Sequence, residues 1–431
     1  MFSFSFNPLN HLSLNTRRYD TMSYEPIFRL PSSSIVDALA FSPRLDWLAS
    51  GDQKGFVKIY ETVTGMERHV FEFDDPVTSL TWHPKENTIF VGLGSGVVAF
   101  IHDFKNLGRQ VASGVKGAEV YTISFSSSGR KLGMGIGQEV HIATPTTDRG
   151  YATTTIFPQP LEDSKTGDAR IRSRGIHFIE SEKQMIVSYL NHGVICWDIY
   201  TRSPIWTIAH SHVPGFIGHS HVSSDERFIC INNLATGFDV YNIKSRTLVR
   251  SLQVPSHRER NVPLVSCFLR DRNVVITASH DGEARVWHVG SGMLMQKLPT
   301  ASSSSIRFIC AGNFRSRGFI AIAPSSKDSG VSVWKELSAP RGALSDIAST
   351  EVIVGLCVVL LLAIVCILVW HPALIPEDWK SLAEVLFRWK KTAYSMGLES
   401  VRRGRKLGAW IAQVLGIAKR NKRRFIRLPE L

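Results

Sequence analysis

The sequence predicts an all-β fold, a seven-bladed β-propeller, followed by one transmembrane α-helix and an amphipathic, basic helical tail. Three observations predict it: a strand repeat that recurs seven times, one run of nineteen uncharged residues, and a surplus of positive charge behind that run. The chain has 431 residues, of which 44% are hydrophobic and 20% are charged. This composition excludes wholesale disorder, a collagen-like repeat and a small disulfide-stapled fold.

An eight-residue ending marks each predicted blade. Each ending combines turn residues with alternating apolar residues, and most place an aromatic residue at the seventh position. These positions are 41, 42, 54, 44, 46 and 47 residues apart, a period typical of propeller blades. The endings are KGFVKIYE (54–61), SGVVAFIH (95–102), GQEVHIAT (137–144), NHGVICWD (191–198), ATGFDVYN (235–242), DGEARVWH (281–288) and DSGVSVWK (328–335).

Two further strands are predicted before each ending. In ALAFSPRLDWLASG (38–51), apolar and polar residues alternate on both sides of a Ser-Pro turn, and the other repeats contain comparable segments. Such alternation is the period of half-buried antiparallel strands. Helices are therefore not expected within the repeats.

These residues resemble the WD-repeat family over roughly residues 25–337. The sixth repeat carries the resemblance best, since Asp281 and Gly282 turn into a strand that Trp287 closes. Ile101 and Ala143 lack the aromatic residue at this position. The resemblance implies a seven-bladed propeller in which blades 2 and 3 depend more on apolar packing than on the family's polar network.

The N-terminal segment is expected to close the ring. Residues 25–31 (EPIFRLP) are similar to the predicted outer strands at 203–209 (SPIWTIA) and 293–299 (MLMQKLP), whereas no comparable strand follows residue 335. An N-terminal strand that completes the last blade removes a free sheet edge.

Residues 352–370 are predicted to cross a membrane. They reach roughly 28 Å as a helix at about 1.5 Å per residue, which matches a hydrocarbon core of about 27–30 Å. The predicted organisation is a disordered extension (1–22), the propeller (23–340), a linker (341–350), the transmembrane helix (351–371) and the tail (372–431).

The tail carries 14 basic and 5 acidic residues from position 371 onward. Its apolar residues follow helical stripes beside basic faces, a pattern typical of helices that lie on anionic bilayers. Binding of a partner protein and binding of nucleic acid are less favoured alternatives. The membrane-surface candidates are Trp379, Trp389, Lys390, Lys391, Arg402, Arg403, Arg405, Lys406 and Trp410.

The propeller is expected in the cytosol, because no secretory signal precedes it and the six cysteines show no disulfide or zinc spacing. An endomembrane is expected, with the endoplasmic reticulum as first choice. A mitochondrial membrane is a weaker alternative. Flanking charge favours a cytosolic tail, whereas the large N-terminal domain favours a lumenal one, so the side of the tail stays open.

No catalytic or phosphate-binding motif is found, so the chain is predicted to be non-enzymatic and without a cofactor. One histidine cluster invites zinc or copper, although a hydrogen-bonding role between blades is the more economical interpretation. The weak metal candidates are His210, His212, His219 and His221.

Two long polar loops, residues 161–175 and 254–263, are candidate binding loops, because such loops on rigid scaffolds often carry function. A solvated insertion without function is the alternative. The candidates for binding an acidic partner or a lipid headgroup are Arg170, Arg172, Arg174, Arg258 and Arg260.

The predicted function is a membrane-anchored scaffold that docks protein partners through a propeller face. One alternative follows from overall layout alone, which resembles the endoplasmic-reticulum exchange factor that loads the small GTPase of coat-protein-II vesicles. That family's Gly-rich cation-binding loop has no counterpart in the first repeat. A second alternative is a phosphoinositide-binding propeller. The segment NFRSRG (313–318) only approximates the paired-arginine motif of that family.

Overall fold

In the computed structural model, the chain divides into two units, Met1–Pro340 and Arg341–Leu431. The structure describes residues 23–337 except 105, 111–116, 148–149, 161–170, 210–212, 214, 256–261, 270–272, 315–316 and 328. The predicted extension 1–22, membrane span 352–370 and basic tail 372–431 lie outside the described residues. Within the described residues, no helix is long and apolar enough to cross a membrane.

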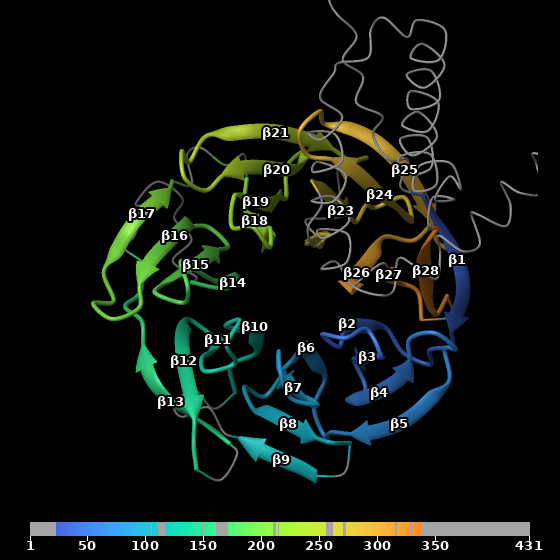
Figure 1. Ribbon diagram of the computed structural model, residues 1–431, viewed down its shortest axis with the longest axis horizontal. Helices are drawn as coiled ribbons and strands as arrows, with labels where there is room; N and C mark the ends of the chain where they lie inside the picture. Colours follow the sequence, from blue (N-terminus) through green and yellow to red (C-terminus); the bar gives the residue numbers. More distant parts are fainter. Residues whose placement is uncertain are drawn as a thin grey trace, which may run out of the picture. The chain divides into compact units, whose positions relative to one another are not determined.

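Seven four-stranded sheets stand in a ring, which confirms the predicted seven-bladed propeller (Figure 1). Blade 1 contains β2 (Val36–Phe41), β3 (Trp47–Asp52), β4 (Phe56–Glu61) and β5 (Glu67–Glu72). Blade 2 contains β6 (Val77–Trp82), β7 (Thr88–Leu93), β8 (Val98–His102) and β9 (Asn106–Gln110). Blade 3 contains β10 (Val120–Phe125), β11 (Leu132–Ile136), β12 (Glu139–Pro145) and β13 (Tyr151–Ile156).

The other four blades follow the same plan. Blade 4 contains β14 (Ser173–Ile179), β15 (Gln184–Tyr189), β16 (Gly193–Asp198) and β17 (Pro204–Ile208). Blade 5 contains β18 (Ile217–Val222), β19 (Phe228–Asn233), β20 (Gly237–Asn242) and β21 (Leu248–Gln253). Blade 6 contains β22 (Ser266–Phe268), β23 (Val274–Thr277), β24 (Glu283–His288) and β25 (Met293–Pro299). Blade 7 contains β26 (Ile306–Phe314), β27 (Arg317–Pro324), β28 (Val331–Leu337) and β1 (Ser23–Leu30).

Short turns with specific side-chain acceptors separate the strands. Between β3 and β4, Asp52 Oδ1 accepts hydrogen bonds from the backbone N–H of Lys54 at 2.9 Å and of Phe56 at 3.0 Å. Gly55 completes this turn with φ of 88°, a conformation that side chains disfavour. A Cβ there would lie 2.1 Å from the carbonyl oxygen of Phe73, so the position requires glycine.

The ring is closed by the pairing of β1 with β28, as the likeness of residues 25–31 to outer strands predicts. The two strands are antiparallel from Ser23 opposite Leu337 to Leu30 opposite Val331. Blade 7 therefore combines strands from both ends of the propeller unit (Figure 1). This pairing covers the outer edge of β28, which would otherwise be free.

The antiparallel course of the strands defines two faces of the disc, one at each end of the strands. Neighbouring strands within a blade are antiparallel, so the turn between its first two strands and the turn between its last two lie at one face. We call this the terminal face, because Ser23 begins β1 there and Leu337 ends β28 there. The opposite connector face carries the turns between second and third strands and the connections between blades.

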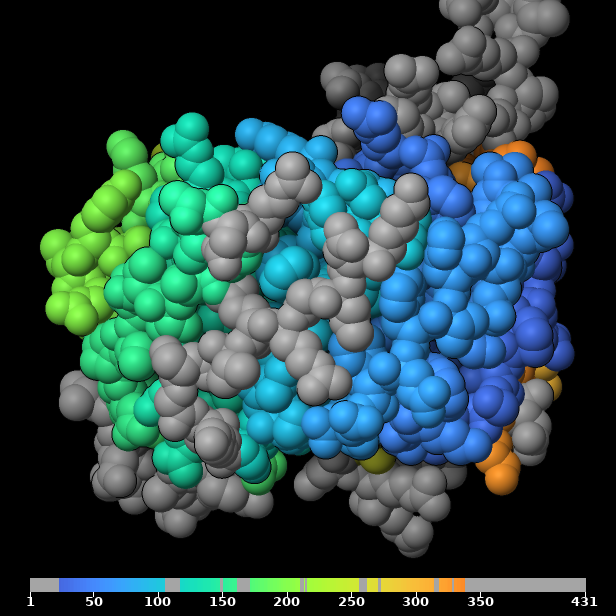
Figure 2. Space-filling model, turned by 90° about the horizontal axis from the view of Figure 1, so that it is seen from below, coloured from blue at the N-terminus to red at the C-terminus, as the bar shows by residue number. Residues whose placement is uncertain are grey.

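The hydrophobic core lies between neighbouring blades. Figure 2 shows the outer wall of the propeller from the side, with blades 1 to 3 in blue, cyan and green. In blade 6, Trp287 Nε1 donates to Thr277 Oγ1 at 2.9 Å, part of the polar network expected for WD-type repeats. Ile101 and Ala143, which occupy the equivalent positions in blades 2 and 3, are fully buried in apolar clusters. This arrangement agrees with the expectation that apolar packing dominates these two blades.

Candidate ligand-binding pocket on the connector face

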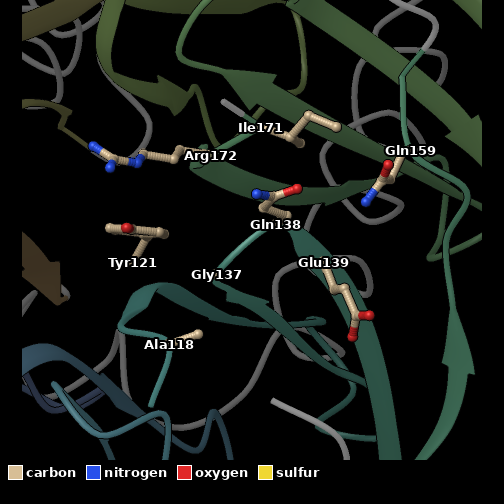
Figure 3. Close-up of a pocket in the computed structure, with 8 residues that line it drawn as sticks. All are labelled: Ala118, Tyr121, Gly137, Gln138, Glu139, Gln159, Ile171 and Arg172. Carbon is tan, nitrogen blue, oxygen red and sulfur yellow. The ribbon is translucent and has the colours of Figure 1, made fainter. Parts of the chain in front are cut away.

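A pocket of about 420 Å³ opens between blades 3 and 4 (Figure 3). It is built from connections before β10 and β14, from the turn between β11 and β12, and from the segment after β13. All of these segments belong to the connector face. The lining residues are Ala118, Tyr121, Gly137, Gln138, Glu139, Gln159, Ile171 and Arg172.

Backbone hydrogen bonds hold the pocket walls. Gly137 N donates to Glu119 O at 3.0 Å, which fixes the two-residue turn that presents the exposed side chain of Gln138. Leu190 N donates to Arg172 O at 2.9 Å and anchors the start of β14. Ile171 is buried, so it provides an apolar surface beside polar walls.

Two arginines share one aromatic ring at this pocket. The Cζ atom of Arg172 lies 5.7 Å from the centroid of the Tyr121 ring, and that of Arg174 lies 5.4 Å from it. Both distances are within the range of cation–π attraction, which holds the guanidinium groups near the ring. Figure 3 shows the Arg172 side chain beside Tyr121, with Gln138 between this pair and Gln159.

Among the described residues, Glu119 attracts Arg174 from a distance without forming an ion pair with it. No described carboxylate forms an ion pair with Arg172 or Arg174, and the buried Nε of Arg174 has no hydrogen-bond partner among the described residues. Burial, reinforced by the charge of Arg172, lowers the pKa of Arg174. Glu139 also lines the pocket, but its carboxylate accepts a hydrogen bond from His141 Nε2 at 2.9 Å.

This arrangement suits an anionic group. A guanidinium has several N–H donors in a planar fork that matches a carboxylate or a phosphate. The amides of Gln138 and Gln159 add neutral donors and acceptors at the rim. The described residues at the pocket show no nucleophile paired with a general base.

The structure brings together only part of the predicted arginine set. Arg172 lines the pocket and Arg174 shares the Tyr121 ring with it, whereas Arg170, Arg258 and Arg260 lie outside the described residues. Sequence reasoning missed Tyr121, Gln138 and Gln159, because each comes from a different part of the chain. The one available signal was the spacing of 54 residues between the third and fourth blade endings, which marks an insertion beside this pocket.

The two described histidines of the predicted metal cluster make hydrogen bonds between blades. His219 Nδ1 accepts from Ser266 N at 3.3 Å, and His221 Nδ1 accepts from Phe268 N at 3.3 Å. Burial lowers the pKa of His219 to about 3 and that of His221 to about 4. His210 and His212 lie outside the described residues, and the described part of the chain contains no group of three metal-binding side chains.

His177 continues this row of contacts in blade 4. Its Nε2 atom lies 3.1 Å from Ser220 Oγ and 3.2 Å from Ser220 O, in the first strand of the next blade. Burial, followed by the charges of His221 and His219, lowers its pKa well below the usual value. The three histidines therefore join the inner strands of blades 4, 5 and 6.

The remaining predicted site residues belong to the basic tail. All nine membrane-surface candidates, from Trp379 to Trp410, lie outside the described residues.

Comparison with known proteins supports the fold assignment. Residues 24–61 match the model of the family described as WD domain, G-beta repeat, a segment that runs from β1 through the third strand of blade 1. No curated protein matches the chain. The match spans one of the seven repeats, and the seven four-stranded blades give the chain a propeller fold similar to that of WD-repeat proteins.

Proposed function

We propose that this protein is a non-enzymatic, membrane-anchored scaffold that docks protein partners on the cytosolic face of an endomembrane, with the endoplasmic reticulum as first choice. A WD-repeat propeller suggests a platform for protein interactions, since it offers rigid faces with many loops. The observation that carries the proposal is the pair Arg172 and Arg174 on Tyr121, at a pocket of the connector face.

The pocket gives the proposed partner a chemical character. Two arginines without a described ion-pair partner favour an acidic segment, whose carboxylates can form charge-assisted hydrogen bonds with them. Ile171 and the Tyr121 ring add apolar surface for a side chain beside the acidic group. An extended acidic peptide therefore fits this pocket better than a neutral one.

The membrane anchor is the second part of the proposal. Its support is the run of nineteen uncharged residues at 352–370, followed by a basic segment. Extraction of isolated membranes with alkaline carbonate tests the anchor. The protein is expected in the pellet, and its release into the supernatant would reject a spanning segment.

Peptide binding tests the pocket independently of the anchor. The probe is a fluorescein-labelled peptide of alternating Glu and Gly, and its matched control replaces each Glu with Gln. We expect the full chain in detergent to bind the Glu peptide at least about tenfold more tightly. The double variant R172Q/R174Q should remove this preference, because each charged hydrogen bond contributes about 1.5–3 kcal/mol.

A control variant separates local from general electrostatics. Arg44 is exposed in the turn between β2 and β3, at the terminal face, and R44Q changes charge away from the pocket. This variant should bind the Glu peptide as the wild type does. Equal loss in R44Q and in R172Q/R174Q, with unchanged thermal stability, would reject the pocket as the site of recognition.

A further inference from the structure

Exposed apolar side chains gather at one edge of the propeller. Of the ten large hydrophobic residues exposed in the described part of the chain, eight lie at the turn between the last two strands of a blade or at the end of β28. The eight residues, which we call the apolar rim, are Val63, Met66, Tyr200, Ile205, Leu248, Met293, Leu294 and Leu337.

Strand direction places the whole apolar rim at the terminal face. Every one of these turns joins the third and fourth strands of its blade, and Leu337 ends the third strand of blade 7. The rim runs through blades 4, 5, 6, 7 and 1, which are consecutive around the ring (Figure 1). The two remaining exposed residues are Ile156 at the connector face and Val70 in the middle of β5.

The side chains of the rim are well exposed on firmly held turns. Tyr200 is 74% exposed, and its backbone N–H donates to Asp198 Oδ1 at 2.9 Å. Leu248 is 52% exposed at the first position of β21. Because the exposed apolar residues recur at the same edge of five consecutive blades, together they can form a contact surface.

In blades 4 and 5 the surroundings of the rim favour a bilayer as the occupant of this surface. Lys244 and Arg246 are exposed in the turn before Leu248, and Arg202 is exposed beside Tyr200, whereas in blade 1 the acidic Glu67 is exposed beside Met66. Apolar and aromatic side chains flanked by basic residues are typical of surfaces that enter the headgroup region of anionic membranes. Tyrosine in particular suits this region, because its ring is apolar and its hydroxyl is polar.

The proposed anchor follows directly after this face in the sequence. Leu337 ends β28 at the terminal face, and fourteen residues, 338–351, precede the predicted span at residue 352. Fully extended, fourteen residues reach at most about 46–50 Å. A tether of this length limits how far the propeller can lie from the predicted span, and it starts at Leu337 on the same face as the apolar rim.

We propose that the terminal face rests on an anionic bilayer, with the apolar rim in the headgroup region. The connector face and its pocket are then directed away from the membrane, toward cytosolic partners. This inference rests on the proposed anchor, but it does not depend on what the pocket binds.

Lipid photo-crosslinking of the full chain tests this orientation. The protein is reconstituted into nanodiscs of phosphatidylcholine and phosphatidylserine that contain a phospholipid with a photoactivatable headgroup, and crosslinked peptides are mapped by mass spectrometry. We expect crosslinks in the turns at 198–205, 242–248 and 288–294, and none in the connector-face turns at 136–139 and 190–193. The rim variant Y200S/L248S should lower the yield at these turns at least about threefold.

The matched control is V70S/I156S, which replaces two exposed apolar residues outside the rim and should leave the yield unchanged. Crosslinks confined to 352–370 and the residues beyond it would overturn the orientation while leaving the anchor intact. Crosslinks between the rims of two protein molecules, without lipid products at these turns, would also overturn it in favour of a dimer. If the anchor proposal is wrong, alkaline carbonate releases the protein from the membranes. If the pocket proposal is wrong, only the peptide-binding result differs from the expectation.

Discussion

Gln296 holds the backbone of Tyr24 with both ends of its side-chain amide. Tyr24 N donates to Gln296 Oε1 at 2.8 Å, and Gln296 Nε2 donates to Tyr24 O at 2.8 Å. Gln296 lies in the outer strand of blade 6, whereas Tyr24 is the second residue of the outer strand of blade 7. One side chain therefore ties the closing strand of the ring to the neighbouring blade.

Replacement of Gln296 should weaken ring closure. Q296A removes two hydrogen bonds, each with a net contribution of about 0.5–1.5 kcal/mol, and leaves the backbone groups of the buried Tyr24 without this partner. A loss of about 1–3 kcal/mol in the free energy of unfolding is expected. Denaturant unfolding followed by tryptophan fluorescence measures it.

Two comparisons sharpen this prediction. Q296E keeps an acceptor for Tyr24 N but places a carboxylate oxygen against Tyr24 O, so it should not restore the stability of the wild type. Deletion of residues 23–31 uncovers the edge of β28 and should abolish the cooperative transition of the whole disc. A deletion variant as stable as the wild type would contradict ring closure by β1.

The turn at Gly55 offers a test of backbone geometry. G55A should cost more than about 2 kcal/mol of unfolding free energy, because its Cβ would lie 2.1 Å from Phe73 O and φ is 88°. Gly117 is a matched control with φ of 84°, and no described atom lies within 4 Å of the position that a Cβ would take there. G117A should therefore cost only about 1 kcal/mol, and equal losses in both variants would contradict the steric argument.

Acid should destabilise the inner strands through the histidines. The pKa values of His219 and His221 lie at about 3 and about 4 in the folded state, below the value of about 6.5 in the unfolded chain. The unfolded state therefore binds more protons between these values, and stability falls as pH falls from about 6.5 toward 4. Each histidine contributes about 1.4 kcal/mol per pH unit within its window.

The hydrogen bonds of the two histidines explain why acid should lower the stability. Protonation of Nδ1 removes the acceptor for Ser266 N in the case of His219 and for Phe268 N in the case of His221. Unfolding measured at intervals from pH 7.5 to 4.5 should show a steep acid limb. The variant H219Q/H221Q should be less stable at pH 7.5 but show a shallower limb, and an unchanged slope would contradict this account.

The repeat made the fold predictable, because each blade repeats the same alternation and turn chemistry. The likeness of residues 25–31 to other outer strands also pointed to the partner of β28. The pocket was less accessible to sequence reasoning. Arg172 and Arg174 stood out as members of a basic loop, but their contact with Tyr121 depends on how blade 3 packs against blade 4.

The apolar rim shows a second limit of sequence reasoning. Leu248 and Met293 look like ordinary strand residues in the alternating pattern, and only the arrangement of the outer strands leaves them exposed at one face. The hydrogen bonds of His219 and His221 depend in the same way on the neighbouring blade. Local patterns predicted each strand, whereas contacts between blades determined which side chains could bind.

Site-specific photo-crosslinking from the pocket tests the central claim most directly. A photoreactive benzoyl-phenylalanine replaces the exposed Gln138 in the full chain, which is expressed in intact cells and irradiated there. We predict discrete protein adducts that disappear in R172Q/R174Q and persist in R44Q. No protein adduct at this position, or the same adducts with and without the two arginines, would contradict a partner-docking role for the connector face.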